Sequence, residues 1–404
     1  MENKIIPYGK QHITEEDIQE VEKVLRSDFL TQGPKVKEFE QNFAEYIGSE
    51  YAVAVANGTA ALHLSALAME IQPGDKVITT PITFAASANC VLYAGGEVDF
   101  VDIDPETYLM DLDKLEEKLE SNPEGTYKGI IPVDFAGYPI DMERIKQIAE
   151  KHNLWIIEDA CHAPGGYFVD SNGNKQIAGN GQFSDLAIFS FHPVKHIATA
   201  EGGMITTNDE TLYNKLQILR THGITKNQNL FKNSPELATG KNQLTTHNSS
   251  LTTYPGWYYE MQELGFNYRL SDLHGALGVS QLKKAEERLK RRNEIAEKYN
   301  EAFKDKNITI PYLKDNVYHA FHLYVIQYKD RKALFDYLRE NNIYTQVHYI
   351  PIHLQPYYRQ KGWKEGDFPV AEEYYKKCLS LPMYPSLSDS EQNYVIDKVQ
   401  EFIQ

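Results

Sequence analysis

The sequence has 404 residues, a length that allows two or three domains, and its 42% hydrophobic and 24% charged residues are ordinary for a soluble globular protein. The formal net charge is −16, from 41 basic and 57 acidic residues. That balance argues against nucleic acid as a partner, because phosphates are neutralised by clustered Lys and Arg.

The three cysteines, Cys90, Cys161 and Cys378, are odd in number and match no zinc or redox spacing. They predict reduced thiols and a cytoplasmic location. No stretch approaches the ~20 apolar residues of a membrane span, and the first residues lack the apolar core of a signal peptide. We therefore expect no membrane partner.

Two helices are predicted before the first strand. Residues 14–17 resemble a capping box, with Asp17 in the place of the usual Glu, and apolar residues follow at helical spacing up to Leu25. Residues 29–34 interrupt this pattern. A second apolar helix face then occupies residues 36–46, and Gly48 ends that helix.

From residue 51 onward, short apolar strands alternate with helices. Strands separated by helices of about 10–15 residues favour a mainly parallel central sheet flanked by helices, and therefore an α/β fold. The strands are expected at residues 51–55, 77–80, 98–102, 130–133, 154–159, 186–189 and 204–207, and the helices from 58 onward, at 85–92, at 112–119, at 145–152 and up to 220.

The alternation lapses after residue 220. Residues 225–253 are rich in Asn, Thr and Ser without an apolar period, which is typical of a functional or disordered loop. Ser271 is the expected N-cap of one long helix that runs toward Tyr299. The remaining chain indicates a strand at 321–328, a helix at 333–341, a strand end at 345–349 and a last helix to 403, opened by a capping box at 388–391.

These patterns predict two domains. The larger is an α/β domain over residues 12–260, and the smaller is an α+β domain over residues 261–404. We expect residues 1–35 to contact the smaller domain.

A lysine follows one of the predicted buried strands. The apolar run at 186–189 ends in a turn at Pro193, and Lys195 comes just after it, ahead of a Gly-Gly pair at 202–203. In open α/β sheets, ligands bind at the carboxyl ends of the strands. Lys195 is therefore placed where chemistry usually occurs, although most lysines on loops are simply solvated.

Two further features lie at predicted strand ends. Residues 57–60, with Gly58 and Thr59, join a strand to a helix whose first N–H groups could bind a phosphate, although small residues are also common at such turns for packing. Asp159 ends another strand, where a carboxylate could bind a metal, cap a helix or pair with a cationic ring nitrogen. A metal is disfavoured because no set of three or four ligands has usable spacing. His162 could orient a ligand or simply pack.

A phosphate-binding turn, a strand-end Asp and a strand-end Lys, in this order, match what pyridoxal 5′-phosphate needs. Lysine forms a Schiff base with its aldehyde. Aspartate keeps the pyridine nitrogen protonated, so that the ring accepts electrons. Lys195 must also lose its proton, which is easier in a desolvated, cationic setting.

Four motifs together resemble one family. They are NGTAAL at 57–62, EDACHA at 158–163, SFHPVK at 190–195 and GFNYRL at 265–270. The sequence resembles the DegT/DnrJ/EryC1/StrS nucleotide-sugar aminotransferases from Tyr8 to the C-terminus. The resemblance implies a fold-type-I pyridoxal phosphate-dependent transferase.

The resemblance also implies roles for individual residues. Lys195 would be the Schiff-base lysine and Asp159 the partner of the pyridine nitrogen. Asn267 would reach the phosphate in the neighbouring subunit, which requires a homodimer with shared active sites. The other cofactor-binding residues would be Gly58, Thr59, Phe84, His162 and Ser190, and the substrate-binding residues would be Tyr8, Phe29, Leu30, Thr31, Gln346, Val347, His348 and Tyr349.

Within the family, residues 192–195 and 346–353 are most similar to members that form a 4-amino sugar in the pseudaminic acid pathway. This implies transfer of the amino group of L-glutamate to C4 of a UDP-linked 4-keto-6-deoxy-N-acetylhexosamine. Two features depart from the pattern of those members: the residues at positions 28–29 and the length of segment 225–253. The identity of the sugar is therefore left open. Alternatives are another keto sugar (3-keto or dTDP-linked), a sugar dehydratase, and a cofactor-dependent sensor without turnover.

Overall fold

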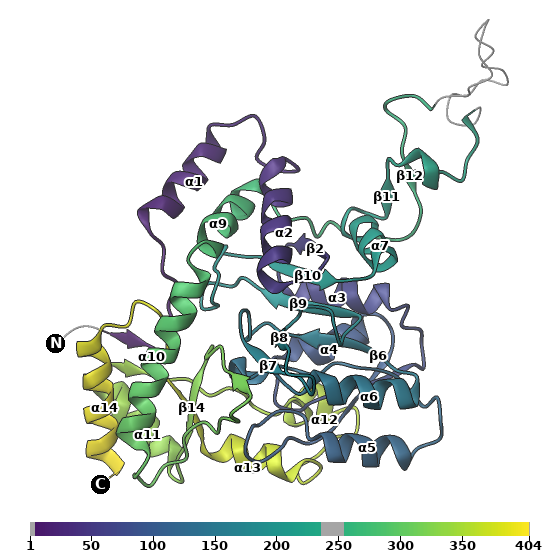
Figure 1. Cartoon of the computed structure of the whole chain (residues 1–404). Helices are drawn as coiled ribbons and strands as arrows, with labels where there is room; N and C mark the ends of the chain where they lie inside the picture. The colour runs from purple at the N-terminus through teal and green to yellow at the C-terminus, as the bar shows by residue number, and fades with distance from the viewer. Residues whose placement is uncertain (1–4, 236–253, 404) are drawn as a thin grey trace, which may run out of the picture.

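A seven-stranded sheet forms the centre of the molecule (Figure 1). In the computed structural model the described residues are 5–235 and 254–403. All strands of this sheet run parallel except β10, which is antiparallel to both of its neighbours. In spatial order the strands are β2 (Tyr51–Val55), β10 (Gly203–Thr207), β9 (Leu186–Ser190), β6 (Trp155–Asp159), β5 (Tyr127–Ile130), β3 (Lys76–Thr79) and β4 (Glu97–Phe100).

Helices cover both faces of this sheet, which gives the predicted α/β fold. On one face, Ala187 and Phe189 of β9 pack in the core beneath α2, and Ile130 of β5 packs beneath α5 and α6. On the other face, Val53 and Ile188 pack against the second helix set. The first set is α2 (Pro34–Ile47), α5 (Leu112–Glu120) and α6 (Met142–His152), and the second is α3 (Gly58–Ala68), α4 (Ala85–Tyr93) and α7 (Glu210–Arg220).

The C-terminal part has a separate core around a small sheet. Tyr324 and Leu379 are buried there together with apolar residues of three helices. Its elements are α10 (Ala285–Phe303), β14 (Tyr324–Gln327), α11 (Arg331–Glu340), β15 (Ile343–Tyr344), β16 (Cys378–Leu381) and α14 (Asp389–Ile403). The buried residues of η3 (Ile352–Leu354), α12 (Pro356–Arg359) and α13 (Pro369–Lys377) pack instead into the core of the central sheet. The division of the chain at residue 260 stays a prediction.

The N-terminal residues lie against the C-terminal part of the chain. β1 (Ile6–Pro7) pairs in parallel with β15, and α1 (Glu15–Leu25) packs on α9 (Asp272–Leu282). Asp17 is buried between these helices and accepts hydrogen bonds from Ser280 Oγ (2.6 Å) and Lys284 Nζ (2.8 Å). Burial alone would raise the pKa of Asp17, but these bonds outweigh burial and lower it to about 2.

Four predictions of local structure can be compared directly. Both capping boxes are confirmed, at residues 14–17 and 388–391. The single helix from Ser271 to Tyr299 is wrong, because the chain leaves helical geometry at Lys284, whose amine turns to Asp17. The strand at 321–328 is shorter, and residues 345–349 form only an isolated bridge at Gln346.

Smaller elements join these parts. A three-stranded sheet consists of β13, β7 and β8, and an arm built on β11 and β12 projects from the body beyond α7 (Figure 1). These elements are β7 (Tyr167–Val169), β8 (Lys175–Ile177), β11 (Ile224–Thr225), η2 (Gln228–Leu230), β12 (Glu260–Met261), β13 (Val317–Tyr318) and η1 (Phe135–Gly137). The predicted loop at 225–253 covers part of this arm, and its residues 236–253 lie outside the described residues. None of the helices in the described chain is both long enough and apolar enough to cross a membrane.

Candidate active site

A cavity of about 680 Å³ opens where several elements of the central sheet end. β6 and β9 point their carboxyl ends into it, and α3 and α4 begin at its wall. Residues 346–350 of the C-terminal part close one side. Because a carboxyl edge of parallel strands meets helix N-termini here, this is the location expected for a ligand in an α/β fold.

One end of the cavity is suited to a phosphate. The first N–H groups of a helix have no partner within the helix. In α3, the N–H of Ala60 donates to the capping side chain of Asn57 (Oδ1, 2.8 Å). Ser190 lies opposite, so close that a Cβ on Gly58 would be 3.0 Å from the Ser190 Cβ. A Cβ on Gly203 would be 2.5 Å from the Asn57 oxygen. Glycine at 58 and 203 thus keeps the helix start open to an anion.

At the end of β6 lies the carboxylate of Asp159, which is 5% exposed. It accepts hydrogen bonds from Ser87 Oγ (2.6 Å) and from the Cys161 N–H (3.2 Å). Thr83 and Ser87 share a further bond of 2.8 Å in the first turn of α4. No ion pair of the described chain includes Asp159, so its charge is held by neutral donors and can face a cationic ligand.

Lys195 is half-buried in the cavity wall. Its backbone N–H donates to the His192 oxygen (2.8 Å), which forms the turn that the sequence predicts at Pro193. Burial lowers the pKa of the ε-amine, and the charges of Cys161 and Asp159 act in the opposite direction. A lowered pKa favours the neutral amine, which is the form that reacts with carbonyl carbon.

Neutral histidines surround this lysine. Burial lowers the pKa of His162 well below its usual value, and the charge of Lys195 adds to this effect. His162 Nδ1 accepts the N–H of Ala136 (3.3 Å), so the ring proton is on Nε2, which faces the Tyr349 hydroxyl (3.4 Å). Burial also lowers the pKa of His348 to about 3. The imidazoles can therefore donate hydrogen bonds here without carrying a charge.

The chain matches a known protein family over residues 11–400, which is described as the DegT/DnrJ/EryC1/StrS aminotransferase family. The chain belongs to this family. This family membership makes it a pyridoxal phosphate-dependent sugar aminotransferase, as the resemblance implied.

Relatives of this aminotransferase match it over nearly their full lengths. It is 40% identical over 410 residues to the spore coat polysaccharide biosynthesis protein SpsC of Bacillus subtilis, covering 99% of this chain and 98% of SpsC. It is 36% identical over 403 residues to UDP-4-amino-4,6-dideoxy-N-acetyl-β-L-altrosamine transaminase of Campylobacter jejuni, covering 97% and 96%. Among solved structures, Helicobacter pylori PseC, an aminotransferase involved in the biosynthesis of pseudoaminic acid, has a TM-score of 0.84 at 30% identity and covers 99% of both chains.

The residues of the aminotransferase fit its cofactor. The helix start that Gly58 and Gly203 leave open can take the phosphate, and the buried carboxylate of Asp159 can take the protonated ring nitrogen. Phe84 is 61% exposed and lines the cavity, where its side chain can cover the cofactor ring. Lys195 lines the same cavity.

The cavity brings together most of the predicted site residues. Four predicted residues do not line it, because they lie on other surfaces of the described chain. Phe29 and Leu30 are 55% and 47% exposed, Thr31 forms a bridge with Ser271, and Asn267 forms a bridge with Thr221. Those that do line it are Tyr8, Gly58, Thr59, Phe84, Asp159, His162, Ser190, Lys195, Gln346, Val347, His348 and Tyr349.

Ser87 and His322 are among the residues of this cavity that sequence reasoning missed. Ser87 bonds directly to Asp159, and its only signal was its position four residues after Thr83, on one face of a predicted helix. His322 packs its ring 4.3 Å from that of His162. It comes from a different part of the chain, and no local pattern marked it.

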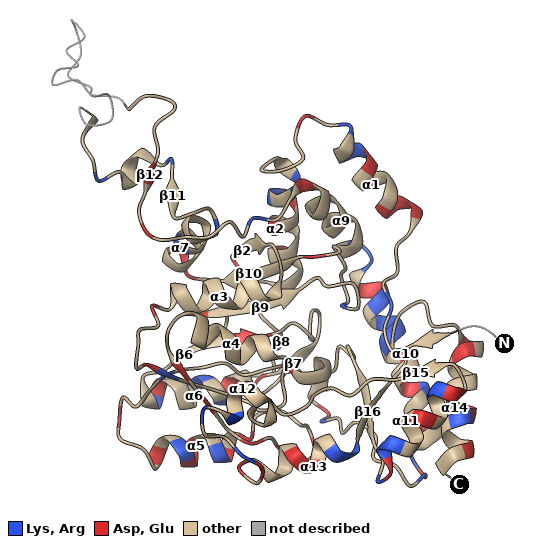
Figure 2. Ribbon diagram, turned by 180° about the vertical axis from the view of Figure 1, so that it is seen from behind, with Lys and Arg blue, Asp and Glu red and all other residues tan. Residues whose placement is uncertain are grey.

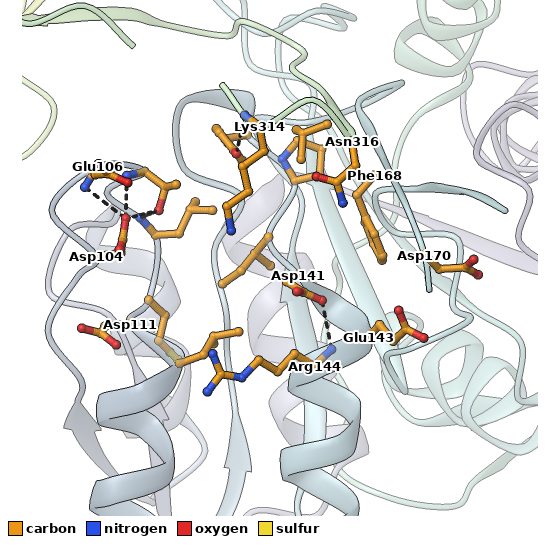
Figure 3. Close-up of a pocket in the computed structure, with 18 of the residues that line it drawn as sticks. Asp104, Glu106, Asp111, Asp141, Glu143, Arg144, Phe168, Asp170, Lys314 and Asn316 are labelled. Atoms are coloured by element: carbon orange, nitrogen blue, oxygen red, sulfur yellow. Dashed lines mark hydrogen bonds between the residues drawn. The ribbon is translucent and has the colours of Figure 1, made fainter. Parts of the chain in front are cut away.

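A second hollow, of about 570 Å³, lies at the N-terminal ends of α5 and α6 (Figure 3). Its carboxylates are already used within the chain. Asp141 caps α6 through the Arg144 N–H (3.0 Å), Asp111 caps α5, and Asp104 accepts from the N–H of Thr107 (2.7 Å). Among the described residues, no cluster of three or more His, Cys, Asp or Glu side chains could hold a metal ion. The carboxylates of Asp104, Asp111 and Asp141 are therefore engaged in turns and helix caps.

Proposed function

We propose that this protein transfers the amino group of L-glutamate to C4 of a UDP-linked 4-keto-6-deoxy-N-acetylhexosamine, in a pathway to a pseudaminic acid-type cell-surface sugar. The observation that carries the proposal is the opening of Lys195, Asp159 and the α3 N-terminus into one cavity. The altrosamine transaminase of Campylobacter jejuni, 36% identical, supports the choice of sugar. The buried free thiols of Cys90 and Cys378 support the predicted cytoplasmic location.

The chain's own residues divide the work as follows. Pyridoxal phosphate, when bound, supplies the aldehyde that joins amines and the ring that accepts electrons. Gly58, Thr59 and Ser190 would hold its phosphate, and Asp159 would keep the ring nitrogen protonated. Lys195, with its lowered pKa, would take a proton from the donor carbon and return it to the sugar carbon as a general acid/base.

The substrate would enter past residues of the C-terminal part. Tyr8 and His348 lie together at the cavity wall, with ring centroids 5.2 Å apart, and Gln346 and Tyr349 continue the same wall. Their hydroxyl, amide and imidazole groups are hydrogen-bonding partners suited to a sugar. SpsC, 40% identical, favours a second candidate, a different nucleotide-linked keto sugar used in a polysaccharide.

The test is a panel of keto sugars. The protein is incubated with L-glutamate and with UDP- or dTDP-linked 4-keto-6-deoxy sugars and 3-keto sugars, and products are identified by mass and NMR. We expect amination at C4 of the UDP-linked N-acetyl sugar, with one 2-oxoglutarate formed per product. Amination of only a 3-keto or dTDP-linked sugar would contradict the proposed substrate. A dehydrated sugar formed without glutamate consumption would instead indicate the dehydratase.

We further propose a homodimer whose sites are shared. Phe29, Leu30 and Asn267 lie outside the chain's own cavity, and the first two expose large apolar side chains. The Asp272 N–H donates to the Leu30 oxygen (3.0 Å) and Thr31 forms a bridge with Ser271, so residues 29–31 lie beside the segment that follows Asn267. These residues would complete the partner's cavity.

Mixed dimers test this sharing. Dimers of one Asn267→Ala chain and one Lys195→Ala chain, purified through two different tags, are expected to have about half of the wild-type activity, because one site keeps both residues. The control is a mixed dimer of Lys195→Ala and Asp159→Asn chains, whose sites are each damaged. If the first mixed dimer is as inactive as this control, Asn267 does not act across the subunits.

A further inference from the structure

Arg292, in α10, is a buried cation without a carboxylate partner. Its side chain is 1% exposed, and Nη1 donates to three backbone oxygens, those of Phe321 (3.0 Å), His322 (3.3 Å) and Met383 (3.1 Å). No Asp or Glu of the described chain forms an ion pair with it. A guanidinium stays protonated in proteins, and although burial lowers the pKa of Arg292 to about 9, it remains charged at neutral pH.

The other arginines of this helix each lie beside a carboxylate. Figure 2 shows basic residues following one another along α10. Arg288, one turn before Arg292, lies 4.0 Å from Asp17, and Arg291 pairs with Asp389 (2.8 Å). Carbonyl dipoles solvate the Arg292 charge but do not cancel it, so its field reaches neighbouring groups through the low-dielectric interior.

Those neighbours form the wall of the active-site cavity. Arg292 holds the backbone of His322, whose ring lines the cavity and packs 4.3 Å from that of His162. His196, next to Lys195, lies 5.8 Å from His322, and its Nε2 is 2.8 Å from the Ala320 oxygen. Arg292 therefore contacts His322, which lines the same cavity as Lys195.

We propose that Arg292 is a positioning residue whose permanent positive charge keeps the ε-amine of Lys195 and the imidazoles of His196 and His322 unprotonated. This inference rests on the proposed role of Lys195 in binding the cofactor. A nearby positive charge disfavours a second one. The amine must be neutral to attack an aldehyde, so the charge would speed the capture of pyridoxal phosphate at neutral pH.

The groups facing Lys195 do not all act in this direction. Burial lowers its pKa most strongly, Cys161 and Asp159 raise it, and Arg292 lowers it again. The pKa values of His196 and His322 are likewise lowered, first by burial, and Arg292 contributes to both. His162 and His348 carry lowered pKa values and are neutral. The other titratable side chains that line the cavity are Tyr8, His192, Glu201 and Tyr349. Arg292 is thus the one fixed cation among the described groups that opposes Asp159.

The experiment measures how fast cofactor-free protein captures added pyridoxal phosphate, followed by visible absorbance between pH 6 and 10. In Arg292→Gln and Arg292→Met, we expect the pH at which the capture rate is half-maximal (the midpoint) to rise by about one unit. Capture at neutral pH then slows about 10-fold. Arg292→Lys holds its charge over a narrower pH range, because burial readily lowers the pKa of a lysine, so its midpoint should lie between those of the wild type and Arg292→Gln. Arg291→Met, which removes a half-buried and paired arginine of the same helix, is the matched control.

An unchanged midpoint in folded Arg292→Gln or Arg292→Met would overturn the inference. Should neither variant fold, Arg292→Lys decides, because a buried lysine loses its charge at lower pH than an arginine. A capture midpoint above the wild-type value supports the inference, and an unchanged midpoint overturns it. A wild-type protein that never captures pyridoxal phosphate would instead contradict the proposed function, so the two failures are distinguishable.

Discussion

Replacement of Lys195 by Ala is expected to abolish covalent attachment of pyridoxal phosphate and to slow amino transfer by about 10²- to 10⁴-fold, the usual range for losing a positioned acid/base. The fold should persist, because the Lys195 amine forms no hydrogen bond or ion pair in the described chain. The backbone bond to His192, which shapes the turn, is retained by Ala. The measurement is borohydride reduction of the cofactor-loaded protein, followed by mass spectrometry of its peptides.

The wild-type protein should carry the reduced cofactor on the peptide that contains Lys195, and Lys195→Ala should carry none. Lys128→Ala, at an exposed position of β5, is the control and should label as the wild type does. Label on a different lysine in the wild-type protein would remove Lys195 from the proposed role, whatever the loss of activity.

The central sheet could be predicted because its signals are local. Apolar runs such as 186–189, bounded by Pro and Gly, are too short for helices, and their alternation with amphipathic segments indicates parallel pairing. The strand order, with β10 inserted antiparallel between β2 and β9, has no such signal. Pairing partners distant in sequence are chosen by packing, which a local pattern does not contain.

The break between α9 and α10 shows the same limit. No Gly or Pro marks residues 283–284, and at the break Lys284 bonds to the buried Asp17 of α1, a contact distant in sequence. The cavity wall at residues 346–350 likewise carries few backbone pairs of its own, and Ile352 is held by a bond to the Pro81 oxygen (2.9 Å). Contacts of this kind determine local geometry from a distance. The motif around Lys195, in contrast, is contained in one strand and one turn.

Replacement of Asp159 by Asn is expected to leave cofactor capture largely intact and to slow amino transfer by about 10²- to 10³-fold, as removal of a preorganised electrostatic partner does. Asn has nearly the same shape, and the phosphate cradle at Gly58 and Ser190 is separate from it. The charge that would keep the ring nitrogen protonated is lost, so the ring becomes a poorer electron acceptor. Measuring cofactor affinity and the single-turnover rate separately distinguishes an effect on cofactor binding from an effect on amino transfer.

Ser87→Ala is the variant that separates charge from geometry. It removes the 2.6 Å hydrogen bond to Asp159 and leaves the carboxylate charge in place. A hydrogen bond to a charged group contributes about 1.5–3 kcal/mol, part of which water entering the cavity can replace, so we expect a loss of about 10-fold or less in rate. If Ser87→Ala is as slow as Asp159→Asn, the orientation of the carboxylate decides the rate. If Asp159→Asn turns over at nearly the wild-type rate, Asp159 is not the partner of the ring nitrogen, because Asn has no negative charge to keep that nitrogen protonated.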